Sequence, residues 1–163
     1  MTEAAELRSD NIFVDEKELR LSHHETKNNE AFTLPLPKLA LELINEATAT
    51  KNARCFQLSS IDDAPMRSWS FFNKAVRRAS GVDQFNLHHL GRTFATQMSE
   101  HSNFDESIID AVLSHKRSAT RAGVMRSYKH AKNIEKRRNV MDAWESFLLA
   151  EVIEQEDRRY EEG

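Results

Sequence analysis

Residues 12–47, with the sequence IFVDEKELRLSHHETKNNEAFTLPLPKLALELINEA, decide the fold class, because the spacing of their apolar side chains changes partway along. Strand-like content comes first, in three short segments at residues 12–14, 19–22 and 32–34. Polar turns separate these segments, a pattern that predicts a small antiparallel meander. Pro35 and Pro37 are expected to end the meander, since proline cannot donate to a strand ladder.

From Lys38 onward the apolar residues follow the spacing of helices. The first expected helix has apolar residues on and beside one face, namely Ala40, Ile44 and Ala47, with Leu39 and Leu43 next to them. Residues 48–67 are polar and irregular, and we expect a loop there. A second helix is predicted between an N-cap at Ser68 and a glycine stop at Gly81.

Three further helices complete the expected fold. One covers about residues 87–100, one follows an N-cap at Asp105, and a long one runs from about Asn133 past Leu149. The side chains expected to face the core are Trp69, Phe72, Val76, Ala79, Ile108, Ile109, Val112, Leu113, Val140, Trp144, Phe147 and Leu148. The sequence therefore predicts a mainly helical α+β domain with a small N-terminal three-stranded antiparallel sheet.

Composition limits the class of protein. The chain has 163 residues, of which 39% are hydrophobic and 30% charged, values typical of one globular domain. No apolar stretch approaches the roughly 20 residues of a membrane span. The first twenty residues carry charges throughout, which does not fit a secretory signal. A single cysteine, Cys55, excludes an internal disulfide, and together these features predict a cytoplasmic protein.

The formal net charge of −3 conceals an uneven distribution. Residues 65–140 hold 14 Lys/Arg against 6 Asp/Glu, a balance of +8, whereas residues 1–64 and 141–163 balance at −5 and −6. A basic middle segment suits a surface that faces nucleic-acid phosphates. Chance clustering on a solvated surface explains the charge pattern equally well when it is taken alone.

Four short motifs follow one another in the chain. They are Thr26-Lys27-Asn28 in the second expected turn, residues 87–96 (LHHLGRTFAT), Leu113-Ser114-His115-Lys116, and Ser127-Tyr128-Lys129-His130. In this order and spacing the chain resembles the tyrosine recombinases, specifically the integrases of phages and genomic islands. The resemblance covers nearly all of residues 3–149, and it rests on the set, since any one motif alone is unspecific.

The resemblance implies a chemistry that needs neither a metal nor another cofactor. Such enzymes break a phosphodiester of double-stranded DNA through a covalent 3′-phosphotyrosine, for site-specific recombination and integration. Tyr128 matches the nucleophile and Lys27 the general acid, which a flexible hairpin tip brings to the leaving oxygen. His88 matches a histidine for proton transfer or phosphate binding, and His115 a donor to a nonbridging oxygen. The basic residues expected to contact DNA are Arg92, Lys116, Arg117, Arg121 and Arg126.

Each of these residues also has an ordinary explanation when considered alone. A lysine in a polar turn commonly serves solubility, a tyrosine commonly belongs to an amphipathic helix, and a histidine commonly caps one. Zinc is disfavoured, because the seven histidines lack a ligand spacing and only one cysteine is present.

Two departures from the family pattern bear on activity. The residue three positions after His88 is Gly91, where the family has an arginine that clamps the phosphate. Arg92 follows, but neighbouring helical residues point about 100° apart, so it does not simply replace the missing group. If Glu3 follows the family's first catalytic arginine, that arginine falls one residue before Met1. We therefore expect residues 1–149 to be a catalytic domain without its first arginine and without the N-terminal core-binding domain, impaired in cleavage.

Two alternatives to a cleaving enzyme remain. The first is a non-catalytic remnant of an integrase that binds DNA or a partner, and the second is a small helical transcription regulator. Residues 150–163 are an acidic tail, expected to be a solvated helix end. Its alternative role is to dock on a second copy of the chain through Val152 and Ile153.

Overall fold

The computed structural model describes the backbone of residues 5–48, 69–113 and 123–161 and, within them, the side chains of residues 5–47, 69–113 and 133–154. It confirms a mainly helical chain with a small antiparallel sheet near its N-terminus. The elements in order are η1 (Ser9–Asn11), β1 (Ile12–Phe13), β2 (Glu18–Leu21), β3 (Phe32–Pro35), α2 (Lys38–Thr48), α3 (Trp69–Ser80), α4 (Leu87–His101), α5 (Glu106–Val112) and α6 (Gly123–Glu161).

The sheet has the strand order β1-β2-β3, and both neighbouring pairs are antiparallel. Leu19 stands at its centre, opposite Ile12 on one side and Leu34 on the other. Pro35 is the last residue of β3, an edge strand, where the lack of an N–H donor costs least. The prediction that prolines end the meander is thus confirmed, one residue later than expected.

A helical core forms where α4, α5 and α6 meet. Its buried side chains are Phe94, Met98, Ile108, Ile109, Val112 and Val140. Trp144 of α6 packs edge-on against Phe94, with ring centroids 5.3 Å apart, and stacks on Phe147 at 5.4 Å. Leu34 of β3 packs against the same cluster, so the sheet and the helices share one core.

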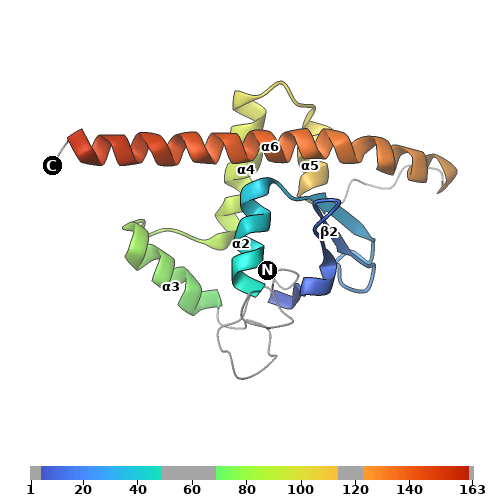
Figure 1. Cartoon of the computed structure of the whole chain (residues 1–163), viewed down its shortest axis with the longest axis horizontal. Helices are drawn as coiled ribbons and strands as arrows, with labels where there is room; N and C mark the ends of the chain where they lie inside the picture. Colours follow the sequence, from blue (N-terminus) through green and yellow to red (C-terminus); the bar gives the residue numbers. More distant parts are fainter. Residues whose placement is uncertain (1–4, 49–68, 114–122, 162–163) are drawn as a thin grey trace.

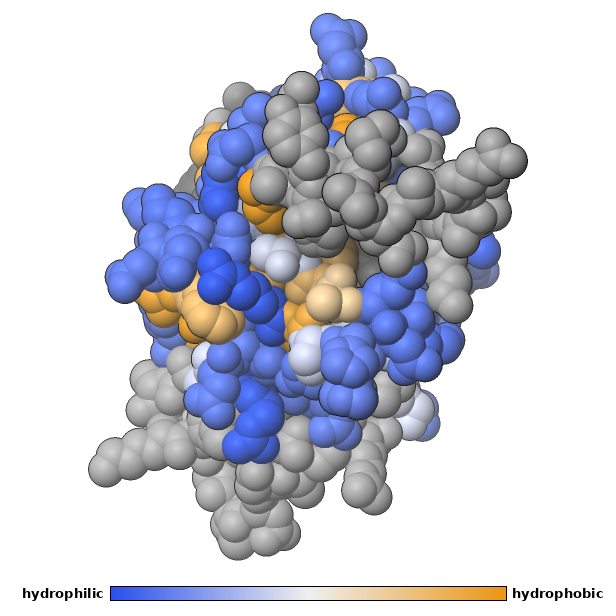
Figure 2. Space-filling model, turned by 90° about the vertical axis from the view of Figure 1, so that its right-hand side faces the viewer, coloured by the Kyte–Doolittle hydropathy of each residue, from blue (hydrophilic) through white to orange (hydrophobic). Residues whose placement is uncertain are grey.

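A second, smaller cluster holds the other part of the sheet to the N-terminal segment and α2. Leu7 and Leu21 are buried in it, and Ile44 of α2 packs against them. Figure 1 shows the result: α6 runs along the long axis, α4 and α5 cross it, and the sheet lies toward its N-terminal end. On the face seen in Figure 2, apolar side chains gather at the centre and hydrophilic ones surround them.

Local sequence signals explain where several helices begin and end. Asn86 caps α4 by accepting a hydrogen bond from the His88 N–H at 3.0 Å. The predicted cap at Asp105 is confirmed, since its carboxylate accepts from the Ser107 N–H at 2.7 Å. Gly81 follows α3 with φ +70°, a left-handed conformation that glycine adopts without strain.

The structure corrects three expectations about the helices. First, α6 begins at Gly123 rather than near Asn133, so the backbone of Tyr128 belongs to it, and it continues to Glu161. Second, Leu148 is 38% exposed rather than buried, and in α2 the buried residue is Leu41, whereas Leu43 is 56% exposed. Third, no side chain of α3 is buried, although its apolar stripe was expected to face the core. Ser68 and residues 49–67 lie outside the described residues.

Among the described helices, none is both long and apolar enough to cross a membrane.

Candidate functional site

The turn that carries Lys27, residues 22–31 between β2 and β3, is closed by a buried threonine. The Thr26 side chain is 6% exposed, and its hydroxyl donates to the Glu30 carbonyl at 2.7 Å and accepts from the Glu30 N–H at 3.1 Å. Asn29 takes a left-handed conformation, with φ 55°, to complete the turn. Lys27 is exposed beside this threonine. The turn that presents the lysine therefore has an internally bonded base, and the expected flexibility of its tip stays a prediction.

A carboxylate fixes the base of the Lys27 turn (residues 22–31) to the N-terminal segment. Glu25 accepts from the Ser22 hydroxyl at 2.7 Å, from the Ser22 N–H at 2.8 Å and from the Asn11 amide at 2.9 Å. Asn11 is itself 8% exposed and also donates to the Arg20 carbonyl at 3.2 Å. The hydrogen bonds from Ser22 and then Asn11 lower the pKa of Glu25, because they stabilise its charged form.

His88 stands at the N-terminus of α4, in its first turn. Its side chain is exposed, while its backbone N–H is held by the Asn86 cap. The Leu87 N–H is held in turn by the Asn73 side chain of α3, at 3.3 Å. The positive end of a helix favours anionic groups, so an imidazole in this place suits contact with a phosphate.

Gly91 lies on the same helix, one turn after His88, and faces the end of α5. A Cβ added to Gly91 would meet the Leu113 Cδ2 atom at 3.7 Å, an ordinary van der Waals distance, and no left-handed backbone conformation requires glycine. The fold therefore has room for a Cβ atom at this position. Arg92, the next residue, is exposed.

The remaining predicted site residues are only partly described. Leu113, the first residue of the third motif, is brought against Gly91 of the second. The backbones of Tyr128 and Arg126 are helical, in the N-terminal part of α6, and their side chains lie outside the described residues. His115, Lys116, Arg117 and Arg121 lie outside them entirely. Convergence of Tyr128, Lys27 and the two histidines on one phosphate thus stays a prediction.

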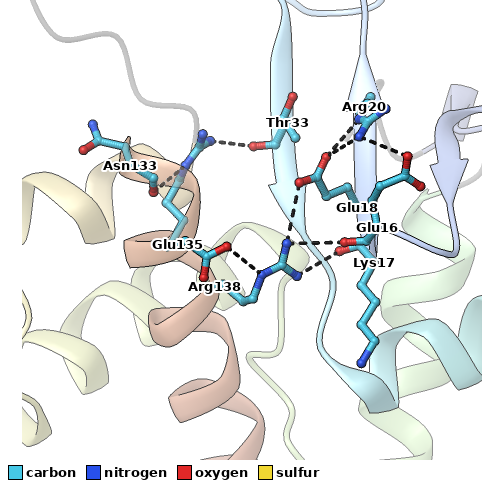
Figure 3. Close-up of polar contacts among 9 residues, drawn as sticks. Glu16, Lys17, Glu18, Arg20, Thr33, Asn133, Glu135 and Arg138 are labelled. Atoms are coloured by element: carbon cyan, nitrogen blue, oxygen red, sulfur yellow. Dashed lines mark hydrogen bonds and ion pairs between the residues drawn. The ribbon is translucent and has the colours of Figure 1, made fainter. Parts of the chain in front are cut away.

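Two arginines that the sequence analysis did not single out join α6 to the sheet (Figure 3). Arg137 is 4% exposed and donates to the carbonyls of Thr33 in β3 and of Asn133 in α6. Burial lowers the pKa of Arg137, and the negative charge of Glu18 opposes that shift. The sequence does hold a sign that Arg137 is buried. Val140 and Trp144 follow it at i+3 and i+7, which places Arg137 on the apolar face of the helix.

Arg138 contacts the neighbouring turn, between β1 and β2. It donates to the carbonyls of Glu16 at 3.3 Å and Lys17 at 3.4 Å. Its guanidinium also forms ion pairs with Glu18 at 3.6 Å and Glu135 at 3.7 Å. Glu18 also forms an ion pair with Arg20 at 2.8 Å. Its largely buried carboxylate therefore pairs with one arginine of the sheet, Arg20, and one of α6, Arg138 (Figure 3).

Within the described residues, no group of three or more His, Cys, Asp or Glu side chains is arranged to hold a metal ion.

Comparison with known proteins gives two matches in agreement. The model of the phage integrase family matches residues 1–133. The prophage integrase IntA of Escherichia coli (strain K12) is 29% identical over 150 residues, which cover 91% of this chain and 35% of that protein. The chain thus spans about a third of the length of this curated relative. No solved structure gives a significant match.

Proposed function

Since the chain belongs to the phage integrase family, we propose that it is the catalytic-domain portion of a tyrosine recombinase for double-stranded DNA. The observation that carries the proposal is the approach of Leu113, the first residue of the third motif, to Gly91 of the second motif. These motifs are far apart in the sequence, and proximity is what a shared phosphate site requires. The closed Lys27 turn and the exposed His88 at a helix N-terminus support the same reading.

The proposed reaction needs no external cofactor. The phenol oxygen of Tyr128 attacks the phosphorus, and its proton passes to a base, for which His88 is the candidate. The bond to the 5′ oxygen breaks, and Lys27 protonates that oxygen as it leaves. The 3′ phosphate stays on the tyrosine until a 5′ hydroxyl attacks it and reverses the steps. His115 donates to a nonbridging oxygen, where negative charge develops.

We further propose that this chain cleaves DNA slowly because Gly91 supplies no guanidinium to the phosphate. Loss of one preorganised donor typically lowers the rate by about 10²–10³. Arg92 does not compensate, because its side chain projects about 100° around the helix from position 91. A Cβ at position 91 would make only an ordinary contact with Leu113, so the proposal can be tested by placing arginine there.

The test is covalent trapping on a library of nicked DNA duplexes with a randomised central sequence. The nick lets the leaving strand diffuse away, so cleaved DNA stays on the protein through denaturation and can be sequenced. We expect Gly91→Arg to trap about 10²–10³ times faster than the natural chain. Gly91→Ala is the matched control for helix stability, and Tyr128→Phe in the Gly91→Arg background should trap nothing. Measurable trapping at the same rate by the natural chain and by Gly91→Arg would refute the impairment.

The second candidate is a remnant that binds DNA without cutting it, and the glycine at position 91 is the observation that favours it. It predicts retention of the library DNA, weakened by salt, with no covalent product in either form. Covalent capture on Tyr128 in the restored variant would exclude this candidate.

Docking of the C-terminal segment on a second copy is also a proposal. Val152 and Ile153 are 53% and 58% exposed on α6, and a protein partner would cover such side chains. Sedimentation of the chain with and without DNA tests it: a monomer in both states would refute docking, and dimers lost in Val152→Ser with Ile153→Ser would support it.

A further inference from the structure

Arg137 has the least exposed charged side chain among the described residues, and the reaction proposed above does not use it. Its guanidinium donates to two backbone carbonyls, those of Thr33 and Asn133, and lies 5.9 Å from the ring centroid of Phe32. Burying a cation costs free energy that such bonds only partly recover, and an apolar residue of similar size often stabilises a core better. Stability alone therefore does not account for an arginine in this place.

The bonds from Arg137 have a direction that apolar packing lacks. A guanidinium is planar, and its donors fix both the distance and the angle to each carbonyl oxygen. The bond to Asn133, one turn earlier in α6, holds the guanidinium on its own helix, and the bond to Thr33 joins it to β3, so together they define how the helix is turned toward the strand. An apolar contact would permit small rotations and slides of α6 across the sheet.

Arg138 adds a second polar connection, or tie, between α6 and the sheet, at a different point of the sheet. It binds the carbonyls of Glu16 and Lys17 in the β1–β2 turn and the carboxylate of Glu18 in β2. The Lys17 carbonyl also accepts from the Leu36 N–H at 2.8 Å, so this tie reaches the chain just after β3. Two ties to separate strands resist rotation as well as translation of the helix.

The tied elements are those that carry the proposed nucleophile and acid. Strands β2 and β3 enter and leave the Lys27 turn, and α6 carries Tyr128 nine residues before Arg137, about 13 Å along the helix axis. We infer that Arg137 and Arg138 are positioning residues, a clamp that fixes the tyrosine helix relative to the lysine turn. The inference rests on the proposed function for the roles of Tyr128 and Lys27, and on the contacts for the clamp itself.

The experiment measures the distance between the two elements without DNA. Spin labels are attached at Lys27→Cys and Lys129→Cys in a Cys55→Ser background, and the distribution of label distances is recorded by pulsed electron resonance. We expect Arg137→Met, which keeps an unbranched side chain but removes the donors, to broaden or shift the distribution. Arg137→Lys keeps a cationic donor group without the planar fork and should restore the natural distribution in part. Lys136→Met is the matched control, because it removes an exposed cation from the adjacent position and should leave the distribution unchanged.

Folding is followed in each variant by the fluorescence of the two tryptophans, Trp69 and Trp144, and by helical circular dichroism. If Arg137→Met does not fold, Arg138→Met decides the matter, because that side chain is 25% exposed and its loss is better tolerated. If the folded variant gives the same distribution of label distances as the chain with both arginines, the clamp is overturned, whatever the outcome of DNA trapping. Failure of the restored chain to trap DNA would instead refute the proposed function and leave the measured clamp in place.

Discussion

Gly91 of α4 lies against Leu113 at the end of α5, with room for a Cβ 3.7 Å from the leucine Cδ2 atom. This contact brings the first residue of the third motif beside the second motif, and at this distance neither a close approach nor a positive φ requires glycine. Outside its own helix backbone, Leu113 supplies the one described atom within 4 Å of that Cβ position.

Replacing Gly91 by alanine is expected to stabilise the protein by up to about 1 kcal/mol, because glycine inside a helix is less favourable than alanine by roughly that amount. Gly91 is the fifth residue of α4, inside the helix and away from its caps. Urea unfolding followed by circular dichroism measures the change. A destabilised Gly91→Ala protein would mean that the Leu113 side chain cannot accommodate the added methyl group.

The Lys27 turn is expected to open on acidification through Glu25. Hydrogen bonds lower the pKa of this carboxylate in the folded protein. Its contribution to the stability of the turn is therefore fully present above the ordinary glutamate pKa. That contribution is lost as the pH falls through the lowered pKa. Protonation removes the negative charge that strengthens the hydrogen bond from the Ser22 N–H. The exchange rate of that amide, measured by nuclear magnetic resonance, should rise in this acidic range relative to amides of α5.

Glu25→Gln is the control for the acid effect, since it cannot take up a proton. In this variant the Ser22 amide should exchange faster at neutral pH and show no further opening on acidification. An acid response that persists unchanged in Glu25→Gln would assign the transition to another group.

Removing the charge of Glu18 tests its ion pairs with Arg20 and Arg138, which Figure 3 shows. Its side chain is 13% exposed and pairs with Arg20 at 2.8 Å and Arg138 at 3.6 Å. Glu18→Gln is expected to cost about 1.5–3 kcal/mol, the range for hydrogen bonds to charged groups. Glu135→Gln is the matched control, because it also contacts Arg138 but from a side chain that is 73% exposed, and it should cost at most about 1 kcal/mol. Equal losses in a urea titration would argue against a special role for Glu18.

The sequence predicted those parts of the fold that local chemistry determines. The strands around Leu19, the caps at Asp105 and the stop at Gly81 follow from strand propensity, from an acceptor before a helix and from glycine's access to positive φ. The start of α6 was missed by ten residues, because residues 123–132 begin with glycine and half of them are polar, which weakens the apolar stripe of Val124, Tyr128 and Ala131.

The sequence predicted only those site residues that a short motif of neighbouring residues identifies. Lys27, His88 and Tyr128 were identified by their neighbours in the sequence, whereas Arg137 and Glu18 act through contacts with residues about 100 positions away. An arginine on an apolar stripe indicates a buried partner but does not say which one. Thr33 accepts through its backbone carbonyl, a group that every residue has, so no side-chain pattern could have named it.

The core contact between α5 and α6 gives a final prediction, about the stability of the whole helical cluster. Ile109 is 2% exposed and packs in the cluster that includes Val140, which has no exposed surface. Ile109→Ala is expected to lower the free energy of unfolding by about 2–5 kcal/mol, through lost apolar burial and the cavity left behind. Leu43→Ala deletes a side chain of similar size that is 56% exposed on α2, and it should cost about 0.5 kcal/mol or less. Both changes are read from urea unfolding of the same protein. Similar costs in the two variants would place the stabilising core elsewhere than between α5 and α6.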